Sequence, residues 1–426
     1  MQIQRKRYLD QLISKKDNAL VKVVTGLRRC GKTFLLKELY AKWLESNGVP
    51  KENIIYLALD KNENAKFRNP LILDEYLKNI IKTATDRCYI IIDEIQYSVP
   101  VPNNYLPPES RTKENQITFY DTVLGLMDLC DLYITGSNSE MLSSDIMTNF
   151  RGRGDEIKVF PLSFSEFYSA RNDISQENAF REYLYYGGMP MILQQKDISS
   201  KTNYLKNLFA KTYEDDIVAR YKIANKDDLG RILDFLASST GSLINPTNIS
   251  NQFGNSAKTS VSRNTVASYI EDIKNSFLIE QASRFDVRGK EYVSGQSKYY
   301  FADLGLRNAR LNFRQFDLPH LLENCVFNEL KARGYSVDVG RVQIRKKNSN
   351  GDYVISYLES DFVINDSDKR MYIQVAEGLD EPGKKEQEKK DKAMIVYSVD
   401  FQRVNVFLFF FCEAFFKKDL RLFLLQ

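Results

Sequence analysis

The stretch from Gly26 to Thr33 limits what this chain can fold into more than any other segment does. It reads Gly-Leu-Arg-Arg-Cys-Gly-Lys-Thr, which matches the pattern G-x-x-x-x-G-K-[ST] at every required position. An apolar, strand-like segment precedes it at 21–25, and an amphipathic, helix-like segment follows it at 34–40. A phosphate-binding loop needs this setting, because its backbone N–H groups and the helix N-terminus form the anion site. The motif therefore predicts a fold that binds a nucleoside triphosphate.

Each residue type in this P-loop has a predicted part in binding ATP. Gly26 and Gly31 allow the backbone to turn tightly and to approach the phosphates. Lys32 is predicted to contact the β- and γ-phosphates, and the Thr33 hydroxyl to ligate Mg²⁺. The other predicted nucleotide-binding residues of the loop are Arg28, Arg29 and Cys30. The two arginines are predicted to act on phosphates or on a neighbouring domain, and a chance glycine–lysine turn is the alternative interpretation of the motif.

A second motif predicts that the triphosphate is hydrolysed. An apolar run at 89–92 ends in Asp93 and Glu94, as a Walker B strand does. Asp93 is predicted to hold Mg²⁺, usually through water, and Glu94 to orient and activate the attacking water. The alternative is an ordinary buried strand that ends in two solvated acids. Together with the P-loop, the motif predicts an ATPase that converts ATP and water to ADP and phosphate.

A third strand-like segment, at 131–136, ends in a run of polar residues that includes Asn138. Ligands of an open parallel sheet lie beyond the carboxyl ends of its strands. Asn138 is therefore predicted to contact the γ-phosphate or the attacking water. The alternative is that this Ser/Asn cluster caps the helix that follows.

Two arginines, Arg151 and Arg153, stand on a glycine-bearing turn further along the chain. An arginine from the same chain or from a neighbouring one stabilises the charge that develops during phosphoryl transfer. Both are candidates for this role. A solvated turn with local ion pairs is the alternative interpretation.

The order of these motifs resembles that of the prokaryotic AAA-superfamily ATPases that have an N-terminal P-loop domain and a C-terminal domain of uncharacterised function. Further matching segments lie at 161–167, 186–190, 298–308 and 322–324. The resemblance covers about residues 1–395. It implies a cytoplasmic bacterial or archaeal protein with an AAA-type core, a winged-helix segment and a C-terminal domain similar to PD-(D/E)xK nucleases.

The expected fold class is α/β, with more than one domain. At 426 residues the chain is too long for one ordinary hydrophobic core. The expected divisions are an AAA-type P-loop NTPase domain with a parallel sheet at 1–165, a helical lid or linker region at 166–227, a winged-helix-like domain at 228–312 and a small α/β, PD-(D/E)xK-like domain at 313–426.

Nuclease activity of that last domain is not expected. A nuclease of this class needs a helix glutamate, a strand aspartate and an E/Q-x-K segment, since the acids bind Mg²⁺ and the lysine positions or activates water. Glu323 or Glu329 is the candidate helix acid, and Asp361 is the candidate strand acid. Ala376 stands where the lysine is required, and the lysines at 384–385 are the alternative source of a cation. We predict that the fold is retained as a surface that contacts nucleic acid or protein, with an ATP-regulated, metal-dependent nuclease as the alternative.

Composition leaves the partner of the chain open. The 60 basic and 56 acidic residues give a formal net charge of +4. That balance neither indicates nor excludes nucleic acid, because binding depends on how charge is clustered. DNA and a protein partner therefore both stay open. So does a homo-oligomer, because AAA-type cores often assemble into rings.

Other features of the composition predict a cytoplasmic protein without a membrane partner. The 5 cysteines form no CxxC pair, as expected of reduced thiols, and the single histidine, His320, argues against a histidine-based metal site or catalytic triad. No signal peptide is visible at the N-terminus. The apolar segment at 404–412 is shorter than the ~20 residues that a membrane-spanning helix needs.

Overall fold

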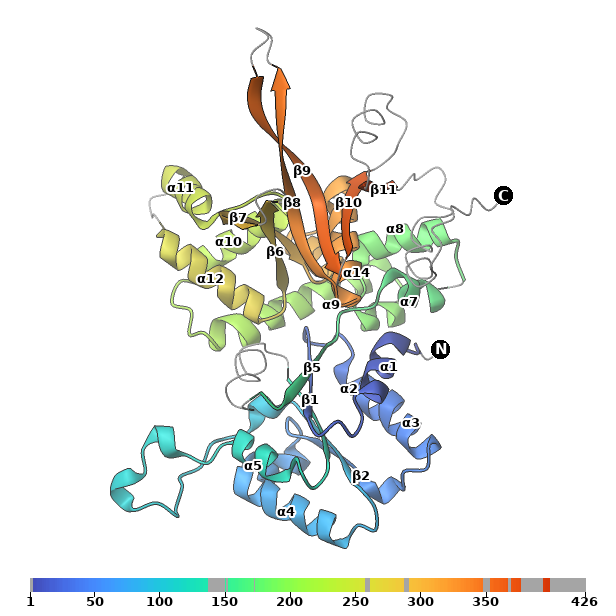
Figure 1. The fold of residues 1–426 in the computed structure, drawn as a ribbon, viewed down its shortest axis with the longest axis vertical. Helices are drawn as coiled ribbons and strands as arrows, with labels where there is room; N and C mark the ends of the chain where they lie inside the picture. Colours follow the sequence, from blue (N-terminus) through green and yellow to red (C-terminus); the bar gives the residue numbers. More distant parts are fainter. Residues whose placement is uncertain are drawn as a thin grey trace. The chain divides into compact units, whose positions relative to one another are not determined.

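The computed structural model describes residues 3–136, 150, 152–171, 173–256, 261–286, 291–347, 353–366, 369–376 and 394–398. These residues form two compact units. The first ends at Val159 and also includes residues 275–277, and the second contains the other described residues from Phe160 onward. The first unit is built on a five-stranded sheet and the second on a six-stranded sheet, coloured blue to green and brown to orange-red in Figure 1.

The sheet of the first unit is entirely parallel, with the strand order β2-β3-β4-β1-β5. Its strands are β1 (Val21–Thr25), β2 (Ile54–Ala58), β3 (Tyr89–Asp93), β4 (Asp131–Thr135) and β5 (Gly154–Lys158). Strands β1, β3 and β4 are buried at every position, as expected of central strands that helices cover on both faces. The predicted α/β fold with a parallel sheet is confirmed.

One continuous helix follows the P-loop, made of α2 (Lys32–Phe34), the π-helix η1 (Leu35–Tyr40) and α3 (Ala41–Ser46). The other helices are α1 (Lys6–Ser14), α4 (Pro70–Thr83) and α5 (Phe119–Leu126), with 3₁₀ turns η2 (Lys51–Asn53), η3 (Asn62–Arg68), η4 (Ile95–Tyr97), η5 (Pro108–Ser110) and η6 (Lys113–Asn115). The side chain of Asn69 accepts from the first backbone N–H groups of α4, and Thr118 and Asp121 form a capping box at α5. These caps determine where both helices begin.

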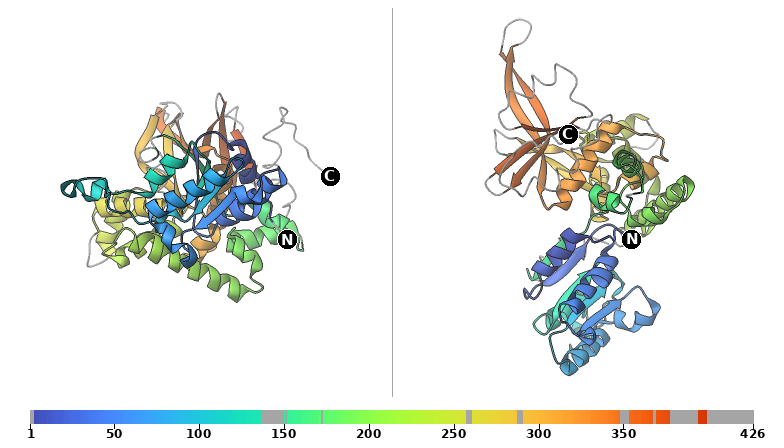
Figure 2. Two further views of the ribbon diagram at one scale, coloured as in Figure 1. Left: turned by 90° about the horizontal axis from the view of Figure 1, so that it is seen from below. Right: turned by 90° about the vertical axis from the view of Figure 1, so that its right-hand side faces the viewer.

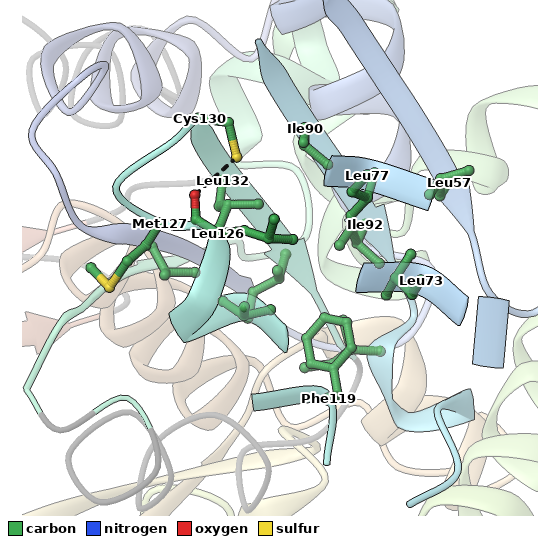
Figure 3. Packing of buried hydrophobic residues seen from close by; sticks show 14 of the residues in the cluster. Leu57, Leu73, Leu77, Ile90, Ile92, Phe119, Leu126, Met127, Cys130 and Leu132 are labelled. Carbon is green, nitrogen blue, oxygen red and sulfur yellow. Dashed lines mark hydrogen bonds between the residues drawn. The ribbon is translucent and has the colours of Figure 1, made fainter. Parts of the chain in front are cut away.

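Helices α4 and α5 supply one side of the core of the first unit. Figure 3 shows Leu73 and Leu77 of α4, together with Phe119 and Leu126 of α5, packed against side chains of the central strands. The buried thiol of Cys130 donates to the carbonyl oxygen of Leu126 at 3.3 Å. The close packing of aliphatic and aromatic side chains across this interface is the main stabilising contribution to the unit.

The central strands also bury a pair of charges. Lys22 on β1 is 0% exposed and its ammonium group contacts the carboxylate of Asp131 on β4. The same carboxylate accepts from the Tyr133 hydroxyl at 2.6 Å and from the backbone N–H of Asp17 at 3.1 Å. Buried charges are tolerated when each has a partner and further hydrogen bonds. This pair therefore makes the registration of β1 beside β4 sensitive to the loss of either partner.

The second unit contains eight α-helices among its described residues. They are α7 (Phe164–Ser169), α8 (Gln176–Tyr186), α9 (Ile198–Lys211), α10 (Lys226–Ser238), α11 (Pro246–Ser256), α12 (Arg263–Asn275), α13 (Leu304–Arg310) and α14 (Leu318–Ala332), with η8 (Pro190–Gln194) and the π-helix η9 (Thr212–Ala219). Among the described residues, the structure contains no helix long and apolar enough to cross a membrane.

The sheet of the second unit has the strand order β11-β10-β9-β8-β6-β7. Its strands are β6 (Ile279–Asp286), β7 (Glu291–Phe301), β8 (Ser336–Lys347), β9 (Tyr353–Asp366), β10 (Lys369–Ala376) and β11 (Met394–Ser398). The aromatic rings of Tyr300, Phe327 and Phe362 join β7, α14 and β9 in the core of this sheet. Because β6 pairs with β8, the boundary predicted after residue 312 divides strands of a single sheet. Local sequence patterns do not report this pairing of distant strands.

Glycines in two of the segments that carry the family resemblance are required by close backbone packing. A Cβ at Gly188 would lie 2.2 Å from the Leu162 carbonyl oxygen, and one at Gly305 would lie 2.0 Å from that of Tyr186. The buried Asp303 carboxylate joins the two segments, since it accepts from the backbone N–H of Gly188 at 2.7 Å. These segments therefore hold the second unit together.

Candidate functional site

The P-loop connects the end of β1 to the start of the helix at Lys32. Gly26 has φ 135° and Gly31 has φ 109°, which are left-handed conformations that favour glycine. A Cβ at Gly26 would also lie 2.1 Å from the carbonyl oxygen of Val159. Both glycines are therefore needed for the path of the loop.

The lysine of the motif is folded against the loop. Lys32 is 4% exposed, and its ammonium group donates to the carbonyl oxygens of Gly26 at 2.8 Å and Leu27 at 3.2 Å. The thiol of Cys30 is buried and lies 3.2 Å from the carbonyl oxygen of Val159. The Cys30 side chain thus anchors the loop to the segment after β5. Arg28 is half-buried and Arg29 is exposed in the same loop.

The carboxylate of Asp93 lies at the centre of a set of hydroxyl groups. Its Oδ2 accepts from the Thr33 hydroxyl at 2.7 Å and from the Tyr56 hydroxyl at 2.7 Å, and its Oδ1 accepts from the Thr135 hydroxyl. Asp93 is 3% exposed, at the last position of β3. The structure therefore brings together Thr33 and Asp93, the two predicted metal ligands, because β1 and β3, which are separated by β4, run parallel and end at the same edge of the sheet.

Glu94 is held in an uncommon backbone conformation. Its φ of 58° is left-handed, which a non-glycine residue adopts only when its surroundings compensate the strain. Its backbone N–H donates to the Thr135 hydroxyl at 3.1 Å, and its carboxylate accepts from the side-chain amide of Gln96. These contacts from β4 and η4 orient the Glu94 side chain next to Asp93.

Tyr56 and Thr135 belong to the site, although motif analysis assigned no role to either. Burial, reinforced by the negative charge of Asp93, raises the pKa of the Tyr56 hydroxyl far above its usual value, so the hydroxyl stays protonated and donates. Thr135 donates to Asp93 and accepts from Glu94. The sequence indicates a role for Thr135 only in that it is a polar residue at the end of an apolar strand. No local sequence pattern indicates a role for Tyr56.

Of the other predicted catalytic residues, Arg153 is the one that the structure describes. Asn138 and Arg151 lie outside the described residues. Arg153 is exposed, and its carbonyl oxygen accepts from the N–H of Val21 at the amino end of β1. At about 3.3 Å per residue, the five residues of β1 separate that end from the P-loop by roughly 13 Å. Arg153 therefore lies at the amino end of β1, whereas the site of the same chain lies at the carboxyl ends of the strands.

A second cluster of charged side chains lies in the six-stranded sheet. Lys298 on β7 is 3% exposed, and its ammonium group lies 3.0 Å from Glu323 Oε1, 2.9 Å from Glu359 Oε1 and 3.7 Å from Asp361 Oδ1. The Tyr300 hydroxyl donates to Glu323 at 2.6 Å. Burial raises the pKa of Glu323 to about 7, although Lys298 acts in the opposite direction.

The predicted helix and strand acids of the nuclease-like region meet in this cluster. Glu323 lies beside Asp361, whereas Glu329 is paired with Arg333 at 2.7 Å. Gln374 donates to Asp361 at 2.7 Å, and Ala376 is the last residue of β10. Lys384 and Lys385 lie outside the described residues. Within the part of the chain that the structure describes, no group of three or more His, Cys, Asp or Glu side chains is arranged to hold a metal ion.

Comparisons with known proteins bear on both units. The family model of an AAA domain matches residues 18–168, and that of a domain of unknown function, DUF8612, matches residues 177–317. An uncharacterized protein of Haemophilus influenzae is 32% identical over 381 residues, which cover 88% of this chain and 86% of that protein. An uncharacterized protein of Methanocaldococcus jannaschii is 27% identical over 410 residues, which cover 93% of this chain and 83% of that protein. Among solved structures, that of the Aeropyrum pernix ORC1 protein in complex with DNA aligns over 73% of this chain and 93% of its own, with 13% identity and a TM-score of 0.28.

Proposed function

Since the chain belongs to the AAA-superfamily P-loop ATPases that carry a separate C-terminal domain of unknown function, we propose that it hydrolyses ATP in an Mg²⁺-dependent reaction whose nucleotide state controls the second unit. The observation that carries the proposal is the 2.7 Å contact between the hydroxyl of Thr33 and the carboxylate of Asp93. In it, the threonine of the P-loop meets the acid at the end of β3, and these are the two groups that such ATPases use for the metal.

The residues present fit both ATP and Mg²⁺. Gly26 and Gly31 shape a loop whose backbone can approach phosphates, and Lys32 lies within it. Thr33 and Asp93 offer the oxygen ligands that Mg²⁺ prefers, with Tyr56 and Thr135 holding Asp93 in place. When bound, Mg²⁺ neutralises charge on the phosphate oxygens.

Glu94 is the proposed general base. Its carboxylate would accept a proton from the attacking water, while the backbone bond to Thr135 and the amide of Gln96 keep it oriented. Asn138 is the proposed contact to the γ-phosphate or water. Arg153 lies at the amino end of β1, away from the site of its own chain. We therefore propose that it, or Arg151, acts on the site of a neighbouring copy in a homo-oligomer.

The second unit is the proposed partner-binding part. The order α10-α11-α12-β6-β7, with an antiparallel bridge between Ile244 and Ser297, supports the prediction of a winged helix. We propose that this region binds DNA or a protein partner according to the nucleotide state. The proposal places the protein in the cytoplasm, in keeping with the buried, unpaired thiols of Cys88, Cys130 and Cys325.

Phosphate release tests the activity and the partner in one experiment. We expect the purified chain to release phosphate from ATP with Mg²⁺ and to fall to background with a chelator, because Thr33 and Asp93 then have no cation to hold. The rate is measured without DNA, with duplex DNA and with single-stranded DNA. Stimulation by duplex DNA supports DNA as the partner, and an unchanged rate favours a protein partner. Release that is equally fast with the chelator would contradict the proposed site.

The position of Lys298 bears on a second candidate function, an ATP-regulated metal-dependent nuclease. This residue comes from β7 and supplies an ammonium group beside Glu323 and Asp361, in a region where Ala376 removes the expected lysine. As arranged, however, the carboxylates surround that ammonium group, and among the described residues no three His, Cys, Asp or Glu side chains are grouped so that they could hold a metal ion. We therefore propose that Lys298 acts as an internal counter-ion and that the cluster does not cleave nucleic acid.

The substitution Lys298→Met separates these two functions. Removing the ammonium group leaves three carboxylates that Mn²⁺ can neutralise, so Mn²⁺ should raise the thermal unfolding temperature of the variant by more than it raises that of the wild type. Asp361→Asn combined with Lys298→Met is the matched control and should respond less. Cleavage of DNA by the wild-type chain with Mg²⁺ or Mn²⁺, lost in Asp361→Ala, would overturn the counter-ion proposal.

A further inference from the structure

Strands β8 and β9 form a two-stranded ribbon that extends past the rest of their sheet. They pair antiparallel from Arg341 opposite Glu359 to Lys347 opposite Tyr353. In contrast, β6 pairs with β8 only at 339–341, and β10 pairs with β9 only at 362–366. Figures 1 and 2 show this segment, which we call the β8–β9 ribbon (341–347 and 353–359), projecting from its unit.

The β8–β9 ribbon exposes large side chains. Tyr353 is 71% exposed, Ile355 58%, Tyr357 46% and Val354 42%. A two-stranded ribbon without a covering layer is only marginally stable in water. A cluster of exposed apolar and aromatic side chains marks an interaction surface more often than it marks ordinary surface.

The sequence of the ribbon is basic. Strand β8 carries four basic residues in seven, at Arg341, Arg345, Lys346 and Lys347, and the one acid among the described residues of the ribbon is Glu359, which pairs with Arg341. Arg345 pairs with Ile355 and Lys347 pairs with Tyr353 in the register, so each of these basic residues stands opposite an apolar or aromatic residue. The Arg341 guanidinium lies over the Tyr357 ring at 3.6 Å from its centroid. Cations interleaved with tyrosines fit a polyanion that also has flat, apolar groups.

The neighbouring helices are less suited to a polyanion. Helix α12 carries Arg263 and Lys274 but also Glu271 and Asp272, and Lys274 is held by Glu271 at 2.8 Å. Helix α11 has no charged residue. Among these described elements, strand β8 therefore carries a larger excess of basic over acidic residues than α11 or α12 does.

We propose that the β8–β9 ribbon binds duplex DNA in its major groove. The major groove of B-form DNA admits a two-stranded β-ribbon, and the cations of β8 then meet the phosphates that border it. The deep, narrow major groove of A-form RNA does not admit one. The inference rests on the proposed function only in naming DNA as the partner whose binding ATP controls.

Fluorescence anisotropy of a labelled duplex, with the full-length chain at several salt concentrations, tests the proposal. The variant Arg345→Ala/Lys347→Ala should bind at least about tenfold more weakly at ~0.1 M salt. The slope of log K against log salt should become less steep by the contribution of about two phosphate contacts, because each contact contributes a slope near −0.9. Tyr353→Ala should also weaken binding but leave the slope unchanged. The matched control, Lys42→Ala/Lys61→Ala, removes two exposed cations of the first unit and should bind as the wild type does.

Circular dichroism first establishes that each variant is folded. Equal binding by wild type and the Arg345/Lys347 variant would overturn the ribbon assignment while leaving DNA as the partner of another surface. The proposal would also be overturned if the wild-type chain bound no duplex DNA, or if it bound single-stranded DNA but not duplex DNA. Phosphate release by the wild type without DNA is measured in parallel, so that failure of the ATPase proposal is seen separately.

Discussion

Glu94→Gln should lower the rate of phosphate release by about 10²–10⁴-fold while ATP still binds, the scale of loss expected when a positioned general base is removed. The amide has nearly the shape of the carboxylate, so the left-handed backbone at residue 94 and its bond to Thr135 are retained. What is lost is an oxygen that accepts a proton from water. The measurement is single-turnover hydrolysis together with retention of labelled ATP, which should accumulate on the variant.

Lys32→Ala is the comparison that separates binding from chemistry. The ammonium group of Lys32 lies inside the loop, so its loss removes the cation predicted to meet the phosphates and should abolish ATP binding. The two variants should therefore differ: one traps ATP and the other does not bind it. Phosphate release at the wild-type rate by both would exclude the site described here.

Asp131→Ala should destabilise the first unit by about 3–5 kcal/mol, because it leaves the ammonium group of Lys22 buried and without its partner. The Asp17 N–H loses its acceptor as well, and the Tyr133 hydroxyl keeps only its hydrogen bond with the Tyr40 hydroxyl. The single tryptophan, Trp43, lies in α3 and its ring stacks on Tyr40 at 6.0 Å. Its fluorescence in a urea titration therefore reports unfolding of the first unit specifically.

Two control variants test whether the unpaired buried charge causes this loss of stability. Asp10→Ala removes the partner of Lys6 from an exposed pair and should cost less than about 1 kcal/mol. The double variant Lys22→Met/Asp131→Asn removes both charges and keeps an acceptor for Tyr133, so it should recover most of the lost stability. A double variant as unstable as Asp131→Ala would show that packing, rather than the unpaired charge, causes the loss.

The candidate site was predictable where its chemistry lies in contiguous motifs. The P-loop and Asp93-Glu94 follow apolar strands, so Thr33 and Asp93 were each predicted as metal ligands from the sequence. Tyr56 was not predicted, because its hydroxyl reaches Asp93 from a different strand, β2. The position of Arg153 could not be predicted from local sequence patterns either. It depends on the direction in which β5 runs beside β1, which puts Arg153 at the amino end of β1.

The sequence by itself determined the nucleotide-binding fold of the first unit, because strand–loop–helix geometry and glycine placement are local properties of the chain. Only the tertiary structure decided the rest. Pairing of β6 with β8 joins regions that the sequence separates, and the same sheet brings Lys298 to Glu323 and Asp361. The burial of Lys22 against Asp131 likewise depends on which strands become neighbours. Such contacts join residues far apart in the chain, so their free energy is realised only when the whole sheet has formed.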